Sequence, residues 1–211
     1  MADYTTFVSG FLAAYAILVV AASSPGPAVA MLIGIASEQG RTPALMATFG
    51  IATGSITLNV ATLLGMGLLL SQASWVLGVV RVAGAAYLFY LAYGAFRKAL
   101  QPPNFTPANV SPRAGWRHFL SGYLIQVSNP KAIAFWVAIA SVGATHGGDA
   151  FVITAFVAGA FAISMICHGA WAVALSSAPA RRAYARGRRW IELGLGGFLT
   201  VAAFRLATSD R

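Results

Sequence analysis

Two proline-centred sequences interrupt hydrophobic segments that are long enough to cross a membrane. The first is Ser24-Pro25-Gly26-Pro27 and the second is Ser128-Asn129-Pro130-Lys131. Proline lacks a backbone N–H and clashes with the carbonyl group four residues earlier, so neither segment can continue as one regular helix. Unpaired carbonyl groups in hydrocarbon are unfavourable unless protein or water satisfies them. We therefore expect both breaks to face the protein interior or a wet cavity. The carbonyl groups expected to lose their helical partners are those of Ala21, Ser23 and Gln126.

Hydropathy assigns the chain to the all-α membrane proteins. It is 58% hydrophobic and only 9% charged, whereas a soluble domain has about 25% charged residues. Residues 4–37 and 42–80 carry no charged side chain, and about 20 apolar residues are enough to span a bilayer. We expect six transmembrane helices, at about residues 6–36, 43–70, 75–96, 116–141, 150–176 and 190–207.

The net charge of +9 collects at the ends of the expected spans. The basic residues of these clusters are Arg97, Lys98, Arg113, Arg117, Arg181, Arg182, Arg186, Arg188 and Arg189. This is the distribution of cytoplasmic loops in a membrane protein, and it argues against a nucleic-acid partner. We expect a multi-pass membrane protein with both termini on the side opposite the cytoplasm. The second cluster is expected to contact anionic lipid.

The two halves of the chain show weak internal repetition. Residues 7–11 (FVSGF) resemble residues 119–123 (FLSGY), and a shift of 109 places Asn59 on His168. Three spans in each half are an odd number, so the halves must be inverted relative to each other, as in many secondary transporters. The expected organisation is a single transporter domain, 1–211, with repeats at 1–100 and 116–211 joined by a proline-rich linker at 101–115.

Both breaks are expected near the middle of the bilayer. Pro27 lies 11 residues from Glu38, and Asn129 lies 12 residues from Arg117. At 1.5 Å per residue these separations are about 16 and 18 Å, within a hydrocarbon core about 30 Å thick. Matched depth on antiparallel helices indicates one central site.

Lys131 is the most specific candidate for a functional residue in the sequence. A lysine at the bilayer centre costs about 2.5–3.5 kcal/mol on insertion scales. Two roles are open: the ammonium group can brace the break through freed carbonyl groups, or it can meet the carboxylate of a substrate.

Other polar residues inside the spans extend the candidate site. Gln126 precedes Pro130 by about one turn, and Asn59 lies inside the second span. His168 and Glu192 are candidates for proton coupling, although a satisfied helix contact and an ion pair with Arg188 are the simpler interpretations. The complete candidate binding set is Ser24, Pro25, Gly26, Pro27, Asn59, Gln126, Asn129, Pro130 and Lys131.

No enzyme motif, metal cluster or nucleotide site is present in the sequence, so we expect no cofactor. The only cysteine, Cys167, excludes an internal disulfide. Gly50 and Gly54 form a small-xxx-small pattern that favours close helix packing or a dimer face. A channel or scaffold is the main alternative to a transporter, and an intramembrane hydrolase using His168 with a nearby serine is a remote one.

The sequence resembles the LysE/RhtB family of bacterial amino-acid exporters. The matching motifs are Ser24-Pro25-Gly26-Pro27, Leu64-Gly65-Met66-Gly67-Leu68, Gly84-Ala85-Ala86-Tyr87-Leu88, Asn129-Pro130-Lys131-Ala132 and Phe135-Trp136. This resemblance implies a six-helix exporter of amino acids or their derivatives in the bacterial inner membrane, coupled to the proton motive force, and leaves a homodimer open. Both termini would then lie in the periplasm. Asn59, where many relatives have histidine, and His168 depart from the family pattern. We expect a small zwitterionic substrate, with a neutral amino acid favoured because embedded acids are scarce.

Overall fold

The computed structural model describes residues 5–72, 74–100 and 115–208, and these residues contain eight α-helices and no strand. The expected linker, 101–115, lies outside the described residues except for Gly115. The helices are α1 (Thr5–Ser23), α2 (Pro27–Glu38), α3 (Arg41–Gln72), α4 (Ser74–Leu100), α5 (Gly115–Val127), α6 (Pro130–Ser141), α7 (Ala150–Ala174) and α8 (Ala178–Thr208).

Both expected helix breaks are confirmed. α1 ends before Pro25, and α2 begins at Pro27 after a bend of 50°. α5 ends at Val127, and α6 begins at Pro130. Pro27 and Pro130 each occupy the start of a new helix, where the missing N–H has no helical partner to lose. The prolines therefore divide each expected span into two half-helices.

Length and hydropathy identify membrane-spanning candidates among the described helices. Three qualify alone, namely residues Arg41–Gly65 of α3, the whole of α7 and the whole of α8. The bent pair of α1 and α2 qualifies as a fourth if it is counted as one span. The architecture is thus that of an all-α membrane protein, and the six-span count remains a prediction.

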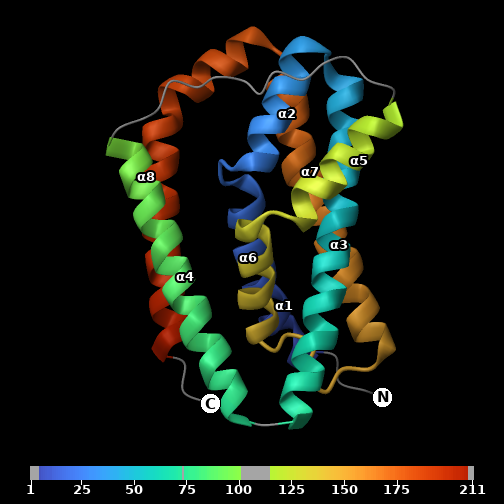
Figure 1. The fold of residues 1–211 in the computed structure, drawn as a ribbon, viewed down its shortest axis with the longest axis vertical. Helices are drawn as coiled ribbons and strands as arrows, with labels where there is room; N and C mark the ends of the chain where they lie inside the picture. The colour runs from blue at the N-terminus through green and yellow to red at the C-terminus, as the bar shows by residue number, and fades with distance from the viewer. Residues whose placement is uncertain (1–4, 73, 101–114, 209–211) are drawn as a thin grey trace.

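The last expected span, 190–207, lies inside a helix that is longer than the span. α8 begins at Ala178 and includes the arginine-rich segment. Arginine has high helix propensity, so a polar segment that does not look like a span still continues the helix. Figure 1 shows these first turns lying across one end of the molecule before α8 runs down beside α4.

The chain runs back and forth between the two ends of the molecule (Figure 1). The α1–α2 pair runs upward, α3 downward, α4 upward, the α5–α6 pair downward, α7 upward and α8 downward. α4 packs along α8, while α3 packs against both α5 and α7. The last turn of α4 and the first turns of α8 carry the basic residues and lie at the same end of the molecule. The start of α1 and the end of α8 lie at the other end.

Glycines allow α3 and α5 to approach closely. A Cβ atom at Gly50 would collide with the carbonyl oxygen of Phe119, and one at Gly122 would collide with that of Ala47. A Cβ atom at Gly54 would meet Gln126 at 3.0 Å. The Gly50–Gly54 pattern is therefore used within the chain, at the helix that carries Gln126.

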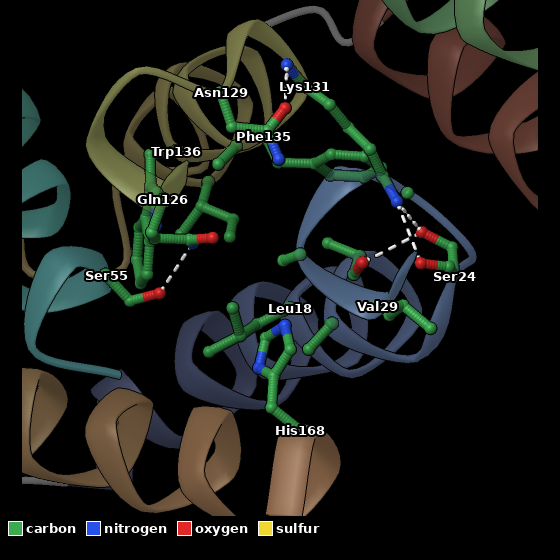
Figure 2. Close-up of a pocket in the computed structure, with 16 residues that line it drawn as sticks. Leu18, Ser24, Val29, Ser55, Gln126, Asn129, Lys131, Phe135, Trp136 and His168 are labelled. Carbon is green, nitrogen blue, oxygen red and sulfur yellow. Dashed lines mark hydrogen bonds between the residues drawn. The ribbon is translucent and has the colours of Figure 1, made fainter. Parts of the chain in front are cut away.

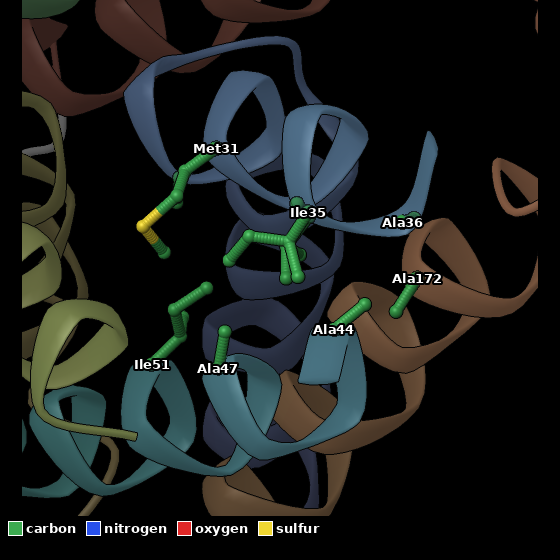
Figure 3. Packing of buried hydrophobic residues seen from close by; sticks show 9 residues of the cluster. Met31, Ile35, Ala36, Ala44, Ala47, Ile51 and Ala172 are labelled. Atoms are coloured by element: carbon green, nitrogen blue, oxygen red, sulfur yellow. The ribbon is translucent and has the colours of Figure 1, made fainter. Parts of the chain in front are cut away.

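An apolar cluster holds α2 against α3 and α7 (Figure 3). Leu32 and Ile35 of α2 are fully buried, as are Ala47 and Ile51 of α3 and Ala172 of α7. Gly40 connects α2 to α3 with φ of +89°, a conformation that favours glycine. The cluster fixes α2, and so one side of the first break, on the α3–α7 pair.

Candidate functional site

A cavity lies where the two helix breaks meet (Figure 2). Its volume is about 40 Å³, which holds about three water molecules at roughly 10–15 Å³ each. An amino acid has more heavy atoms than three water molecules, so the cavity must widen to accept one. The lining residues are Leu18, Ala21, Ala22, Ser24, Gly26, Ala28, Val29, Ser55, Gln126, Asn129, Lys131, Ala132, Phe135, Trp136, Ile139 and His168.

Lys131 crosses from the second break to the first. Its Nζ atom donates to the carbonyl oxygen of Ser24 at 3.0 Å and also to the Ser24 hydroxyl. The ammonium group lies 6.0 Å from the centre of the Phe135 ring. Figure 2 shows the lysine side chain reaching over the cavity toward the turn between α1 and α2. The two broken helices are therefore joined by one cationic contact.

Two of the three carbonyl groups that were expected to lose their helical partners have local ones. The hydroxyl of Ser24 donates to the carbonyl oxygen of Ala21 at 2.8 Å, and the backbone N–H of Asn129 donates to that of Gln126 at 3.2 Å. The expected loss of helical partners at Ala21 and Gln126 is thus compensated close by in sequence. Lys131 instead binds the carbonyl group of Ser24, inside the turn itself.

Asn129 stabilises the start of α6. Its Oδ1 atom accepts a hydrogen bond from the backbone N–H of Lys131 at 3.0 Å, which is the geometry of a helix N-cap. The Asn129 side chain also lines the cavity and is buried. The residue therefore fixes the backbone from which Lys131 extends.

A chain of buried hydrogen bonds forms the opposite wall of the cavity. The Gln126 amide donates to the Ser55 hydroxyl at 2.8 Å, and the Ser164 hydroxyl lies 3.4 Å from that of Ser55. Nδ1 of His168 lies 3.3 Å from the Ser164 hydroxyl and 3.0 Å from the Ser164 carbonyl oxygen. These contacts tie α5, α3 and α7 together beside the cavity.

Ser55 and Ser164 were missed by the sequence analysis, although a signal for them was present. They are separated by 109 residues, the same offset that aligns Asn59 with His168. A serine inside a hydrophobic helix is unremarkable alone, because its hydroxyl commonly bonds its own helix backbone. Only the packing of α3 on α7 makes these two serines a pair.

Other expected site residues lie outside this cavity in the described conformation. Asn59 is 1% exposed, and its amide has no hydrogen-bond partner among the described residues. Pro25 and Pro27 line a separate cavity on the other side of the turn. Glu192 is also 1% exposed and lies 3.9 Å from Arg188, so their ion pair is confirmed but is not at the surface.

The cavity has chemically distinct walls. Lys131 supplies a cation at one end, and Ser55, Gln126 and His168 supply hydrogen-bonding groups at the other. Within the described part of the chain, no carboxylate side chain lines it. Among the described residues, no group of three or more His, Cys, Asp or Glu side chains could hold a metal ion. The arrangement suits a small anionic or zwitterionic molecule.

Broken membrane helices around a buried polar cavity are typical of secondary transporters. The chain belongs to the family of LysE type translocators, which it matches over residues 19–210. It is therefore a multi-pass membrane transporter.

The comparisons also identify related proteins of similar length. The chain is 32% identical to the threonine efflux protein of Escherichia coli (strain K12) over 195 residues, which cover 90% of this chain and 92% of the relative. It is 31% identical to the threonine efflux protein of Salmonella typhi, over 86% of this chain and 88% of the relative. The uncharacterized membrane protein YahN of Escherichia coli (strain K12) is 27% identical, over 87% and 82%. No solved structure matches the chain.

Proposed function

We propose that the protein exports amino acids across the bacterial inner membrane as a secondary transporter. The observation that carries this proposal is the ammonium group of Lys131, which lies in a cavity between two broken helices. A lysine at this depth is unfavourable unless it has a partner. Its present partner is the carbonyl group and hydroxyl of Ser24, neutral groups that a substrate carboxylate can replace with a stronger charge-assisted contact.

The substrate we propose is a neutral amino acid, with threonine as the first candidate. Two of the relatives described above are named threonine efflux proteins. The carboxylate would bind Lys131, and the carbonyl groups at the breaks, together with Gln126, would receive the ammonium group. The described residues that line the cavity include no acidic side chain, which disfavours lysine and arginine as substrates.

The proposed mechanism is alternating access by two inverted repeats. The breaks of α1–α2 and α5–α6 occur at corresponding places in the two halves, and each of the pairs α3–α7 and α4–α8 runs antiparallel (Figure 1). The contact of Ser55 with Ser164, at the repeat offset of 109, supports a two-fold axis near that point. Six spans with the basic ends in the cytoplasm would leave both termini in the periplasm.

The driving force we propose is the proton motive force. His168 lines the cavity, and Glu192 lies within electrostatic range of Lys131. Either side chain could exchange a proton as the cavity opens, and a protonophore should therefore abolish concentrative transport into inside-out vesicles. Transport that persists without a proton gradient would contradict this coupling.

Replacement of Lys131 or Pro130 tests the proposed function. Lys131→Ala and Pro130→Ala should abolish export of L-threonine while the amount of protein in the membrane is retained. The first variant removes the cation, and the second lets α5 and α6 join as one helix. Thr53→Ala is a suitable control, because this half-buried residue of α3 does not line the cavity. Wild-type export by the Lys131 variant would contradict the proposed site.

A further inference from the structure

A second cavity adjoins the first at the break between α1 and α2. Its volume is about 200 Å³, against about 40 Å³ for the cavity at Lys131. Gly26 and Val29 line both cavities, so the turn at residues 25–27 is the partition between them. The other walls carry Lys98 from the end of α4, and Tyr184 and Arg188 from α8.

The partition is thin at Gly26. A Cβ atom at this position would lie 3.2 Å from Nζ of Lys131. The backbone of Gly26 is extended, with φ of −165°, and any residue can adopt this conformation. A side chain here would therefore crowd the ammonium group on the far side of the turn, which would have to shift by a few tenths of an ångström.

Positive charge surrounds the partition on both sides. Lys98 and Arg188 line the second cavity, and Lys131 lies across the turn from it. These three basic side chains outnumber the buried carboxylate of Glu192, which lies 3.9 Å from Arg188, so basic groups are in excess around the turn. Such a local excess attracts anions and raises their concentration at the site.

We propose that this second cavity binds the carboxylate of the amino-acid substrate before it moves to Lys131. Lys98 and Arg188 would hold the carboxylate through charge-assisted contacts, and the first residues of α2 would line the rest of the site. This inference rests on the proposed function and adds a second binding site to it. We call this second cavity, lined by Lys98 and Arg188, the outer site. Because the cavities share Gly26, movement of the α1–α2 turn is the step that transfers the carboxylate from one to the other.

Matched charge reversals on α4 test the outer site. The measurement is uptake of radiolabelled L-threonine into inside-out membrane vesicles over a range of concentrations. Lys98→Glu should raise KM about tenfold, the effect of losing about 1.4 kcal/mol of binding, with little change in the maximal rate. Arg97→Glu is the control, because this neighbouring residue is exposed like Lys98 and undergoes the same charge change but does not line the cavity.

A second matched pair lies on α8. Arg188→Gln should raise KM, and Arg189→Gln should leave it within about twofold of wild type. Equal KM values within each pair, with an active wild type, would overturn the outer site alone. A rise in KM that disappears in vesicles of neutral lipid would instead assign the cavity to lipid phosphate and overturn the inference. A wild type that moves no amino acid overturns the proposed function and this inference with it.

Discussion

At the scale of single residues, the structure bears most directly on the role of Lys131. The sequence left two roles open, a brace for the break and a ligand for a carboxylate. In the structure the ammonium group contacts Ser24 and also lines a cavity. The two roles are compatible if Ser24 is the partner in the absence of substrate and releases the ammonium group when a carboxylate arrives.

Replacing Lys131 with an apolar side chain distinguishes the two roles through the thermal stability of the protein. Lys131→Met should abolish export without lowering the thermal unfolding midpoint of the purified protein. Burial of a cation that has no carboxylate in contact is unfavourable, and an apolar residue of similar length removes that cost. The measurement is the unfolding midpoint in detergent, with Ser24→Ala measured in parallel. A large fall in the midpoint for Lys131→Met alone would show that bracing dominates.

At the scale of the helices, the close packing of α3 against α5 shapes the cavity. It holds Gln126 against Ser55 at 2.8 Å and so shapes one wall of the cavity. Gly50 and Gly122 permit this approach because a methyl group at either would meet a carbonyl oxygen of the opposite helix.

Alanine at these glycines should force the helices apart. Gly50→Ala and Gly122→Ala are expected to destabilise the protein by about 1–3 kcal/mol each, as overpacking does. Gly65→Ala is the matched control on α3, because a Cβ atom added there would have no other atom within 4 Å. That change should be neutral or stabilising by up to about 1 kcal/mol. Thermal unfolding of the three variants checks the prediction, and equal midpoints would refute close packing at this pair.

At the scale of the whole molecule, two residues that the expected repeat aligns lie in different surroundings. His168 lines the cavity, whereas Asn59, at the offset of 109, is buried away from it without a hydrogen-bond partner in the described part of the chain. If inverted repeats exchange conformations during transport, these two positions should exchange surroundings.

Cysteine labelling can follow this exchange. In a Cys167→Ala background, Asn59→Cys and His168→Cys should change their rates of reaction with a thiol reagent in opposite directions when L-threonine is added. The expected reason is that one position enters the cavity as the other leaves it. Leu64→Cys, on an exposed face of α3, should be unaffected. Changes in the same direction at positions 59 and 168 would contradict an exchange between repeats.

The sequence predicted the class of fold and the two breaks because both follow from local properties of the chain. Uncharged runs such as residues 42–80 require a membrane or a large buried core, and proline interrupts a helix wherever it occurs inside one. The choice of Lys131 as a candidate residue followed in the same way, from one charge in an apolar segment. The earlier start of α8, at Ala178, could not be predicted because hydropathy locates a span and not the helix that contains it.

Hydropathy and proline chemistry by themselves determined that this chain forms membrane helices, where two of them break and which break carries the cation. These are properties of single segments and need no knowledge of neighbours. Only the tertiary structure decided that Lys131 binds Ser24, that Ser55 meets Ser164 and that Gly26 separates two cavities. Those contacts depend on which helix faces meet and how closely, and packing between segments distant in sequence sets both.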